Sequence, residues 1–186
     1  MGGVRAAAAL LTVVGLLTAC AGPRVVDRYT PESVVLERDA REQLRLWHRA
    51  AAEGDFDAYF SRMTRGAVFL GTDAGERWTR AEFEAFARPY FDGEEAWSYE
   101  QVQTNIRIGP VAPARIAWVD EVLHNEKYGL CRGTGVLIRE PDGAWRIDHY
   151  SLSFLVPNDL AEAVVGVIRG HGHTRSGHEA GGAGEP

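Results

Sequence analysis

The chain has 186 residues, of which 45% are hydrophobic, and its formal net charge is -6 at pH 7. This length suits one domain of ordinary size with terminal extensions, and the apolar content is sufficient to form a core. The negative charge excludes the basic surface on which nucleic-acid binding depends, so no nucleic-acid partner is expected.

The N-terminal segment combines Arg5 with an uncharged apolar run from Ala6 to Ala19. This run is too short for a comfortable membrane span, and its length and position favour a signal peptide over residues 1–19. It ends in Leu-Thr-Ala-Cys20, which resembles a bacterial lipobox. The resemblance implies that Cys20 becomes the first residue, carries palmitate-type acyl chains and anchors the protein in a lipid bilayer. The alternative is an ordinary signal peptide cut after Ala19, with Cys20 as an incidental thiol.

A lipid anchor predicts a location in the bacterial cell envelope. Ala21 follows the cysteine, and a residue other than Asp at this position resembles the sorting signal for the outer membrane, where the domain would face the periplasm. Residues 20–29 are then the tether of the lipidated cysteine. The other cysteine, Cys131, is interpreted as a small strand residue, because the sequence shows no electropositive setting that would activate its thiol.

Three helices are predicted in the first half of the chain. Thr30-Pro31 is a helix start, with an N-cap followed by proline in the first turn. Apolar residues then recur at steps of three and four and predict a long covering helix: Leu36, Ala40, Leu44, Trp47 and Ala51. Gly54 ends it, and a short helix is expected from 56 to about 62. A third helix begins after Thr79, because Thr79 and Glu82 match a capping box.

The rest of the domain is predicted to form strands. Runs at 66–72, 97–108, 115–124, 130–140 and 144–154 are rich in β-forming residues and are separated by turn residues. The apolar face of the second run changes parity, which indicates a bulge near Glu100 or Gln101. Residues 159–169 could form a short closing helix. Residues 170–186 have no large apolar side chain and are expected to be disordered.

Helices followed by hairpin strands predict an α+β fold over residues 30–158, with the N-terminal helices covering a curved antiparallel sheet. Four stretches resemble a SnoaL-like domain of the nuclear-transport-factor-two-like superfamily: EGDFDAY at 53–59, VFLGTD at 68–73, Trp78 with ARPY at 87–90, and DGAWRI at 142–147. The resemblance covers about residues 36–158 and implies a cone with an internal pocket and no cofactor. The superfamily includes ketosteroid isomerase, polyketide cyclases and members without chemistry, so it indicates fold rather than activity.

The last strand determines which side chains line the predicted pocket. Trp145, Ile147 and His149 alternate with polar residues, which favours a buried position for His149. A two-residue turn at 141–142 keeps His149 on the pocket face. A three-residue loop with a glycine bulge would place Tyr150 there instead. The first register is preferred, because the second brings two charged residues of this strand close to the apolar side without evident partners.

In the preferred register, Asp120, Thr134 and His149 form a polar row, with Arg132 diagonal to Asp120. The candidate pocket residues are Trp78, Tyr90, Trp118, Asp120, Arg132, Thr134, Trp145 and His149. Asp120 and His149 are candidate catalytic residues, as base and as acid or orienting donor, with Tyr90 or Thr134 hydrogen-bonding an oxyanion. The alternative is that Asp120 pairs with Arg132 and that His149 is a satisfied core group.

Three functions are compatible with these features. The first is a membrane-anchored domain that binds a small, largely apolar molecule; the sequence contains no metal-ligand or phosphate-loop motif, so neither a metal nor a cofactor is expected. The second is a cofactor-independent lyase or isomerase similar to the polyketide cyclases. The third is a non-catalytic module that forms a homodimer through the convex face of its sheet. If Glu121 faces this convex side, it is expected to be a surface or dimer-contact residue.

Overall fold

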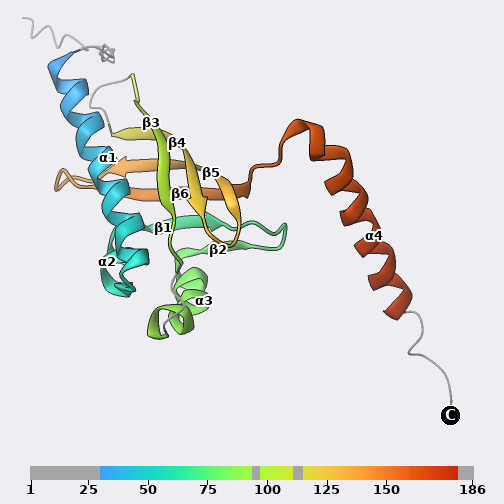
Figure 1. Ribbon diagram of the computed structural model, residues 1–186. Helices are drawn as coiled ribbons and strands as arrows, with labels where there is room; N and C mark the ends of the chain where they lie inside the picture. The colour runs from blue at the N-terminus through green and yellow to red at the C-terminus, as the bar shows by residue number, and fades with distance from the viewer. Residues whose placement is uncertain (1–29, 94–96, 111–114, 180–186) are drawn as a thin grey trace, which may run out of the picture.

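A computed structural model describes residues 30–93, 97–110 and 115–179 of the chain (Figure 1). The helices are α1 (Pro31–Ala52), α2 (Phe56–Ser61), α3 (Arg80–Asp92), the 3-10 turn η1 (Asn158–Leu160) and α4 (Ala161–Glu179). The strands are β1 (Met63–Leu70), β2 (Arg77–Thr79), β3 (Glu100–Ile108), β4 (Ile116–Asn125), β5 (Gly129–Arg139) and β6 (Trp145–Phe154). This order confirms the predicted α+β class.

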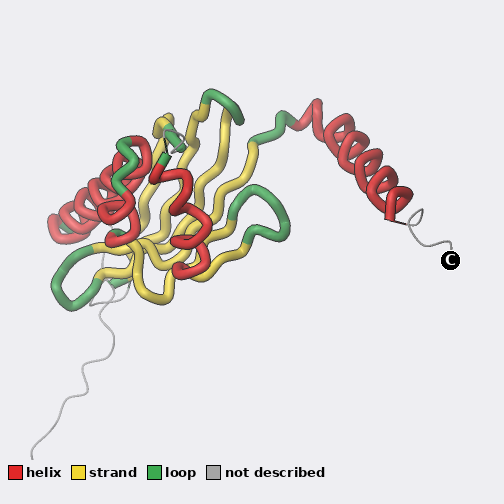
Figure 2. The backbone as a smooth tube through the Cα atoms, turned by 90° about the horizontal axis from the view of Figure 1, so that it is seen from below, coloured by secondary structure: helices red, strands yellow, loops and turns green. Residues whose placement is uncertain are grey.

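The six strands form one curved sheet in the order β2-β1-β6-β5-β4-β3. Strands β3 to β6 form an antiparallel meander, whereas β1 pairs with β6 in parallel. The sheet is therefore mixed, and the prediction of a purely antiparallel sheet is wrong at this one junction. Figure 2 shows the strands side by side, with α1 and α3 lying over one face of the sheet.

The helices begin where their caps predict. Thr30 accepts a hydrogen bond from the backbone N–H of Ser33 at 3.1 Å, and Thr79 and Glu82 form a complete capping box. The apolar stripe of α1 is buried as expected: Leu36, Ala40, Leu44, Trp47 and Ala51. Helix α1 packs on β3 and β6, and α3 packs on β1, so the helices close one side of a cone.

The last hairpin has the three-residue loop rather than the preferred two-residue turn. Arg139 pairs with Trp145, the backbone N–H of Glu140 donates to the carbonyl of Ala144 at 2.9 Å, and Gly143 has a φ of 87°. A left-handed φ at this loop position is accessible to glycine at little cost. The preferred register is therefore wrong.

A second irregularity in β6 explains why both halves of this strand contribute to the core. Leu137 pairs with Ile147 and Val136 pairs with His149, so Asp148 is an extra residue in the ladder. Trp145 and Ile147 are buried before this bulge, and Tyr150 and Leu152 are buried after it. The bulge moves His149 to the outer face and brings Tyr150 to the inner face.

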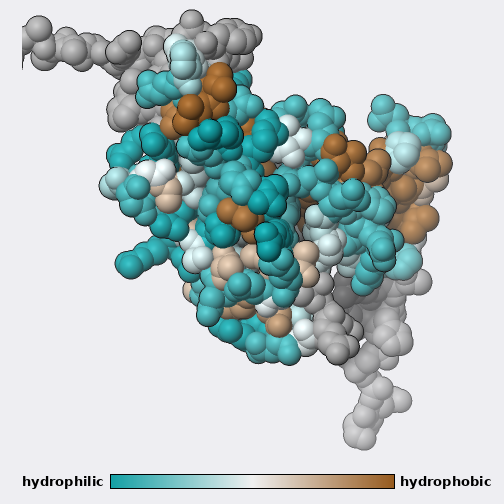
Figure 3. Space-filling view, turned by 60° about the vertical axis from the view of Figure 1, so that its left-hand side comes forward, coloured by the Kyte–Doolittle hydropathy of each residue, from teal (hydrophilic) through white to brown (hydrophobic). Residues whose placement is uncertain are grey.

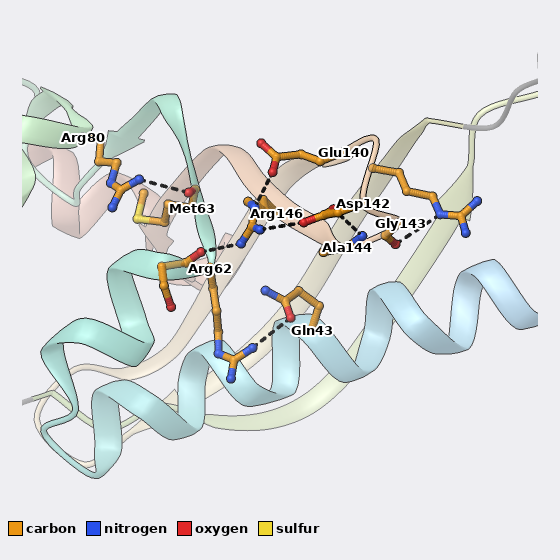
Figure 4. A network of polar contacts seen from close by, with 11 residues as sticks. Gln43, Arg62, Met63, Arg80, Glu140, Asp142, Gly143, Ala144 and Arg146 are labelled. Atoms are coloured by element: carbon orange, nitrogen blue, oxygen red, sulfur yellow. Dashed lines mark hydrogen bonds and ion pairs between the residues drawn. The ribbon is translucent and has the colours of Figure 1, made fainter.

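The charged residues of β6 find partners that the sequence did not reveal. Arg146 donates to Glu140 at 2.5 Å and to the carbonyl of Ser61 at 2.7 Å (Figure 4). Asp148 accepts a hydrogen bond of 2.7 Å from the hydroxyl of Thr64 on β1. Because these groups are paired at the edge of the core, the bulged strand does not leave buried charges without partners.

Helix α4 extends away from the domain (Figure 1). All described side chains from Val156 to His171 are exposed, and Figure 3 shows hydrophobic atoms on this projecting arm at its right-hand edge. The helix expected at 159–169 is therefore present, but it continues to Glu179 and does not cover the domain. Residues 180–186 of the predicted disordered tail lie outside the described residues. Residues 170–179, which were predicted to be disordered because they have no large apolar side chain, are thus part of a helix. Within the described residues, no helix is long and apolar enough to cross a membrane.

Candidate functional site

The inner face of the sheet is set by the odd-numbered residues of β4 and β5. Ala117, Val119 and Leu123 are buried on β4, and β5 buries Cys131 and Leu137. Both strands also have apolar side chains on the other face, so alternation alone does not distinguish the two faces. Glu121 lies among the inner residues of β4 and is fully buried. The expectation that Glu121 is a surface residue is therefore wrong.

Glu121 is the centre of a buried polar network. Its Oε1 lies 2.8 Å from Nε2 of His48 on α1 and accepts a hydrogen bond of 2.5 Å from the Tyr150 hydroxyl on β6. Its Oε2 accepts a hydrogen bond of 2.8 Å from the Gln101 amide, and the Thr104 hydroxyl lies 3.5 Å away. Both carboxylate oxygens are thus hydrogen-bonded, which is the condition for burying a charge at tolerable cost.

The surroundings of this network keep Glu121 ionised. Burial alone would raise the pKa of Glu121, but the hydrogen bond and charge of His48, with the hydrogen bonds from Tyr150 and Gln101, lower that pKa below its ordinary value. Burial raises the pKa of Tyr150 well above the usual range, and the neighbouring Glu121 charge adds to this effect. Tyr150 is therefore a neutral donor to a carboxylate.

Two glycines of β5 make room for the Tyr150 side chain. A Cβ at Gly133 would lie 2.0 Å from the Tyr150 hydroxyl oxygen and 2.9 Å from Cγ of Glu121. A Cβ at Gly135 would lie 2.8 Å from the carbonyl of His149 and 3.0 Å from Cδ2 of Tyr150. Tyr150 crosses β5 over these positions to reach Glu121 on β4, so the Gly-x-Gly pattern has a direct structural purpose.

A small void lies beside the network. It has a volume of about 20 Å³ and is lined by Trp47, His48, Tyr59, Phe69, Trp97, Tyr99, Leu123, Tyr150 and Leu152. Tyr59 is buried, which raises its pKa well above the usual range. Burial likewise raises the pKa of Tyr99 to about 12. Both phenols are therefore protonated at neutral pH and can donate hydrogen bonds.

A larger cavity of about 930 Å³ adjoins this void and opens to solvent. Phe69, Trp97, Tyr99 and Leu152 line both spaces. One wall of the cavity consists of stacked aromatic rings: Phe69, Trp78, Phe83, Phe86, Tyr90 and Trp97. The rings of Phe69 and Phe83 are 4.1 Å apart and 11° from parallel, and those of Trp78 and Phe86 are 4.6 Å apart and 22° from parallel. This wall offers a flat apolar surface.

Polar and charged residues also line the cavity. Its lining includes Glu76, Glu100, His124, Glu126 and Lys127. The latter four lie at the open ends of β3 and β4 and in the turn that follows β4, where solvent reaches them. The cavity thus combines an aromatic wall with a polar rim, the usual composition of a site for a small organic molecule.

The predicted pocket residues separate into three groups. Trp78 and Tyr90 line the large cavity. Trp145 is buried in the core, 3% exposed, and lines neither cavity. The outer face of the sheet holds the remainder: Trp118, Asp120, Arg132, Thr134 and His149. The expected pocket row is therefore wrong, because the inner residues of β4 and β5 are the odd-numbered ones.

The candidate catalytic pair does not share a cavity. Asp120 is exposed and accepts a hydrogen bond of 2.9 Å from the Asn105 amide. None of the ion pairs among the described residues joins Asp120 to Arg132, so the alternative pairing is not formed either. His149 lies on the outer face beside Val136. Sequence reasoning missed His48, placed Glu121 on the surface and put Tyr150 in the pocket only in the register that was not preferred. The Gly133 and Gly135 spacing marks where a large side chain crosses β5.

A mixed sheet wrapped around an aromatic cavity and covered by N-terminal helices defines the cone-shaped α+β class. Residues 41–157 match the family model described as "SnoaL-like domain". The chain therefore belongs to the SnoaL-like family, and the predicted resemblance is confirmed. No curated protein sequence matches the chain.

Solved structures with the same fold share little sequence with this chain. An NTF2-like protein of unknown function from Pseudomonas putida KT2440 is 16% identical, with a TM-score of 0.55 over 68% of this chain and 91% of that one. A proposed dehydratase of the NTF2-like family from Streptomyces avermitilis is 16% identical, with a TM-score of 0.55 over 69% and 100%. A proposed ketosteroid isomerase from Shewanella frigidimarina NCIMB 400 is 18% identical, with a TM-score of 0.52 over 63% and 97%. These similarities support the fold alone.

Proposed function

We propose that this protein is a lipid-anchored binding protein of the cell envelope, whose SnoaL-like domain holds a small, largely apolar molecule in the aromatic cavity. The cavity itself carries this proposal: about 930 Å³ of space, with one wall of six stacked aromatic side chains and with polar and charged side chains elsewhere in its lining. This volume is in the range of pockets for small organic ligands. Phe86 and Tyr90, 39% and 38% exposed, are apolar surface that a ligand would cover.

Binding is favoured over catalysis because the only fully buried carboxylate among the described residues, that of Glu121, is not free to react. Glu121 is fully buried and its carboxylate is saturated with hydrogen bonds, so it is not available to remove a proton from a ligand. The charged side chains at the rim are solvated groups such as Glu126 and Lys127.

A second candidate function is a lyase or isomerase that uses the buried network. The observation in its favour is that His48 and Tyr150 line the small void beside the cavity, where they could touch the end of a ligand. Proton transfer to a carbonyl would then pass through the Tyr150 hydroxyl, with Glu121 as its hydrogen-bond partner. Turnover of a bound cyclic ketone that is lost in Tyr150→Phe, with binding retained, would support this candidate.

Binding is tested with a protein that lacks residues 1–20 and keeps every described residue. A screen of planar apolar compounds by thermal shift should give stabilisation that follows mass action. Phe86→Ala should weaken binding of a hit about tenfold, through loss of roughly 1.5 kcal/mol of stacking and apolar contact. Phe154→Ala is the matched control, because Phe154 is 44% exposed and lines neither cavity. Equal effects of the two substitutions, or no ligand at all, would contradict the proposal.

The anchor is tested separately from the cavity. Cys20 lies outside the described residues, and the sequence from Leu17 to Cys20 after an apolar run is what supports acylation. Cys20→Ser should move the full-length protein from the membrane fraction to a soluble or unprocessed form. Retention in the membrane with unchanged electrophoretic mobility would contradict lipidation.

A further inference from the structure

The projecting helix α4, with the turn η1 before it, exposes an apolar face to solvent. Five branched side chains of this segment are 36% to 64% exposed: Leu160, Val164, Val165, Val167 and Ile168. At about 100° per residue they fall within one half of the helix surface, whereas Glu162 and Arg169 lie on the opposite half. The first part of α4 is therefore amphipathic, and no described residue buries its apolar face.

The sequence of α4 does not favour a helix that stands alone in water. Valine and glycine are poor helix formers, and α4 places Val164, Val165 and Val167 beside Gly166 and Gly170. Most helical stability in proteins comes from packing of an amphipathic face rather than from propensity. A surface that covers the apolar face would therefore stabilise this helix.

The apolar face continues to the mouth of the large cavity. Phe154 and Val156 are exposed where β6 leads to α4 (Figure 1). The ring of Phe154 lies 5.2 Å from that of Tyr128, which lines the cavity. The backbone N–H of Leu155 donates to the carbonyl of Leu130 on β5 at 2.9 Å. Helix α4 is therefore attached beside the open end of the cavity.

The segment that precedes the described domain indicates what covers the apolar face. Residues 20–29 separate Cys20, the proposed acylation site, from Thr30. Ten residues span at most about 35 Å, so an anchored domain stays within that distance of its bilayer. A second contact with the same bilayer is then intramolecular in effect, and a weak affinity is sufficient for it.

A second copy of the chain fits the face less well than a bilayer does. From Leu160 to Ile168 the apolar face is about 12 Å long. Pairing of two such short faces would bury much less than the ~1,200 Å² of a stable protein interface. Binding to a bilayer scales with the apolar area that is buried and requires no complementary protein surface.

We propose that the apolar face of α4 lies in the surface of the bilayer and holds the mouth of the aromatic cavity toward it. Glu162 and Arg169, one charge of each sign, remain on the water side, so the helix lies in the plane of the interface and does not depend on anionic lipid. The inference rests on the proposed function. It narrows the ligand class to apolar molecules that dissolve in the bilayer and enter the cavity from there.

Vesicle flotation tests the contact without the lipid anchor. The protein that lacks residues 1–20 should float with dioleoylphosphatidylcholine vesicles, and about 0.5 M NaCl should leave the bound fraction unchanged, because apolar burial rather than charge drives binding. Val164→Gln/Ile168→Gln should lower the partition coefficient about tenfold, because it removes two of the five apolar side chains. Glutamine is a better helix former than valine or isoleucine, so loss of helix would not explain this result.

The matched control is Glu162→Gln/Arg169→Gln. It introduces the same two glutamines on the opposite face of the helix and leaves the net charge unchanged. This variant should float as the unsubstituted protein does. Failure of the unsubstituted protein to float, or equal losses in the two double variants, would overturn the inference. Binding that requires anionic lipid and is abolished by salt would also overturn it.

Sedimentation equilibrium without vesicles tests the second copy as the alternative occupant. The protein that lacks residues 1–20 should have the same mass with and without the Val164→Gln/Ile168→Gln substitutions. A dimer that dissociates only in this variant would show that another chain covers the face, and the bilayer contact would be wrong.

Transfer of pyrene, a planar apolar fluorophore that dissolves in bilayers, separates this inference from the proposed function. From pyrene-loaded dioleoylphosphatidylcholine vesicles, the transfer rate to the unsubstituted protein should rise with vesicle concentration, because the ligand enters during contact with the bilayer. Transfer to Val164→Gln/Ile168→Gln should be about tenfold slower, in line with its weaker contact, while pyrene added from water should bind both proteins equally.

The outcomes of the two experiments are distinguishable. Flotation without any binding of pyrene would contradict the proposed cavity ligand and leave the bilayer contact intact. Binding of pyrene with equal transfer rates in both proteins would leave the proposed function intact and overturn entry of the ligand from the bilayer.

Discussion

The hydroxyl of Tyr150 on β6 donates a hydrogen bond of 2.5 Å to Glu121 on β4, across the intervening strand β5. The contact is possible because β5 presents Gly133 and Gly135 under the tyrosine ring. It links three strands on the inner face of the sheet, and His48 adds α1 to the same carboxylate. The network therefore ties the covering helix to the sheet at the inner end of the cavity.

Tyr150→Phe should destabilise the domain by about 2 kcal/mol, because it removes a hydrogen bond to a buried charge and leaves the carboxylate with fewer donors. Urea unfolding at neutral pH measures the change. Tyr128→Phe is the control, since Tyr128 is 44% exposed and its hydroxyl donates no hydrogen bond to a described residue. A loss of stability no larger than that of the control would contradict the role given to the Tyr150 hydroxyl.

Gly133→Ala should cost about 2 kcal/mol or more, because the new Cβ would lie 2.0 Å from the Tyr150 oxygen and 2.9 Å from Cγ of Glu121. Gly66→Ala on β1 is the matched control, since a Cβ there meets nothing within 4 Å. Removal of the hydroxyl should make the alanine easier to accommodate. The double variant Gly133→Ala/Tyr150→Phe should therefore lose less stability than the sum of the two single variants.

Two results would contradict the less-than-additive loss of stability predicted for the double variant. Additive losses would show that Gly133 and Tyr150 act independently, and that the glycine is required for another reason. Equal stability of Gly133→Ala and Gly66→Ala would show that the inner face of β5 has space for a methyl group. Either result would remove the structural explanation of the Gly-x-Gly spacing.

The pH dependence of stability should report on Glu121. Its pKa is lowered in the folded state from the ordinary value of 4.5, so ionisation of this group stabilises the fold above about pH 4.5, and the contribution is lost as pH falls through the folded pKa. Glu121→Gln should cost about 3 kcal/mol at neutral pH and should flatten this part of the stability curve. Urea unfolding between about pH 6 and pH 3 measures both effects.

Glu126→Gln is the control for the acid range. Glu126 is exposed on the rim of the cavity and forms no ion pair with a described residue, so its substitution should leave the pH dependence unchanged. If the free energy of unfolding of Glu121→Gln falls with decreasing pH as steeply as that of the unsubstituted protein, other carboxylates dominate acid unfolding.

Local sequence signals predicted much of the fold. The Thr30 cap, the capping box at Thr79 and the apolar stripe of α1 each depend on residues within one or two turns, and the structure has all three. The bulge expected near Glu100 or Gln101 lies one residue further on, between Gln101 and Gln103. Such features are predictable because their physical cause lies in the same short segment.

The candidate site was not predictable in the same way. The two faces of β4 are similarly apolar, and the inner one contains Glu121, whose burial depends on donors from α1, β3 and β6. A loop of three residues and a bulge at Asp148 together decide that Tyr150, not His149, faces inward. Partners so distant in sequence leave no periodic signal, and a one-residue shift exchanges the two faces.

Truncation of the chain after Leu160 should leave the domain folded. Helix α4 contacts mainly η1, and all its described side chains up to His171 are exposed, so its removal uncovers no core residue. The melting temperature should therefore change by less than about 2 °C, which corresponds to a few tenths of a kcal/mol in a domain of this size.

Truncation after Tyr150 is the contrasting variant, because it removes Leu152, which is 9% exposed and lines both cavities. That variant should be strongly destabilised. A large loss of stability from the shorter deletion alone would show that α4 packs against the domain, or against a second copy of it, in solution.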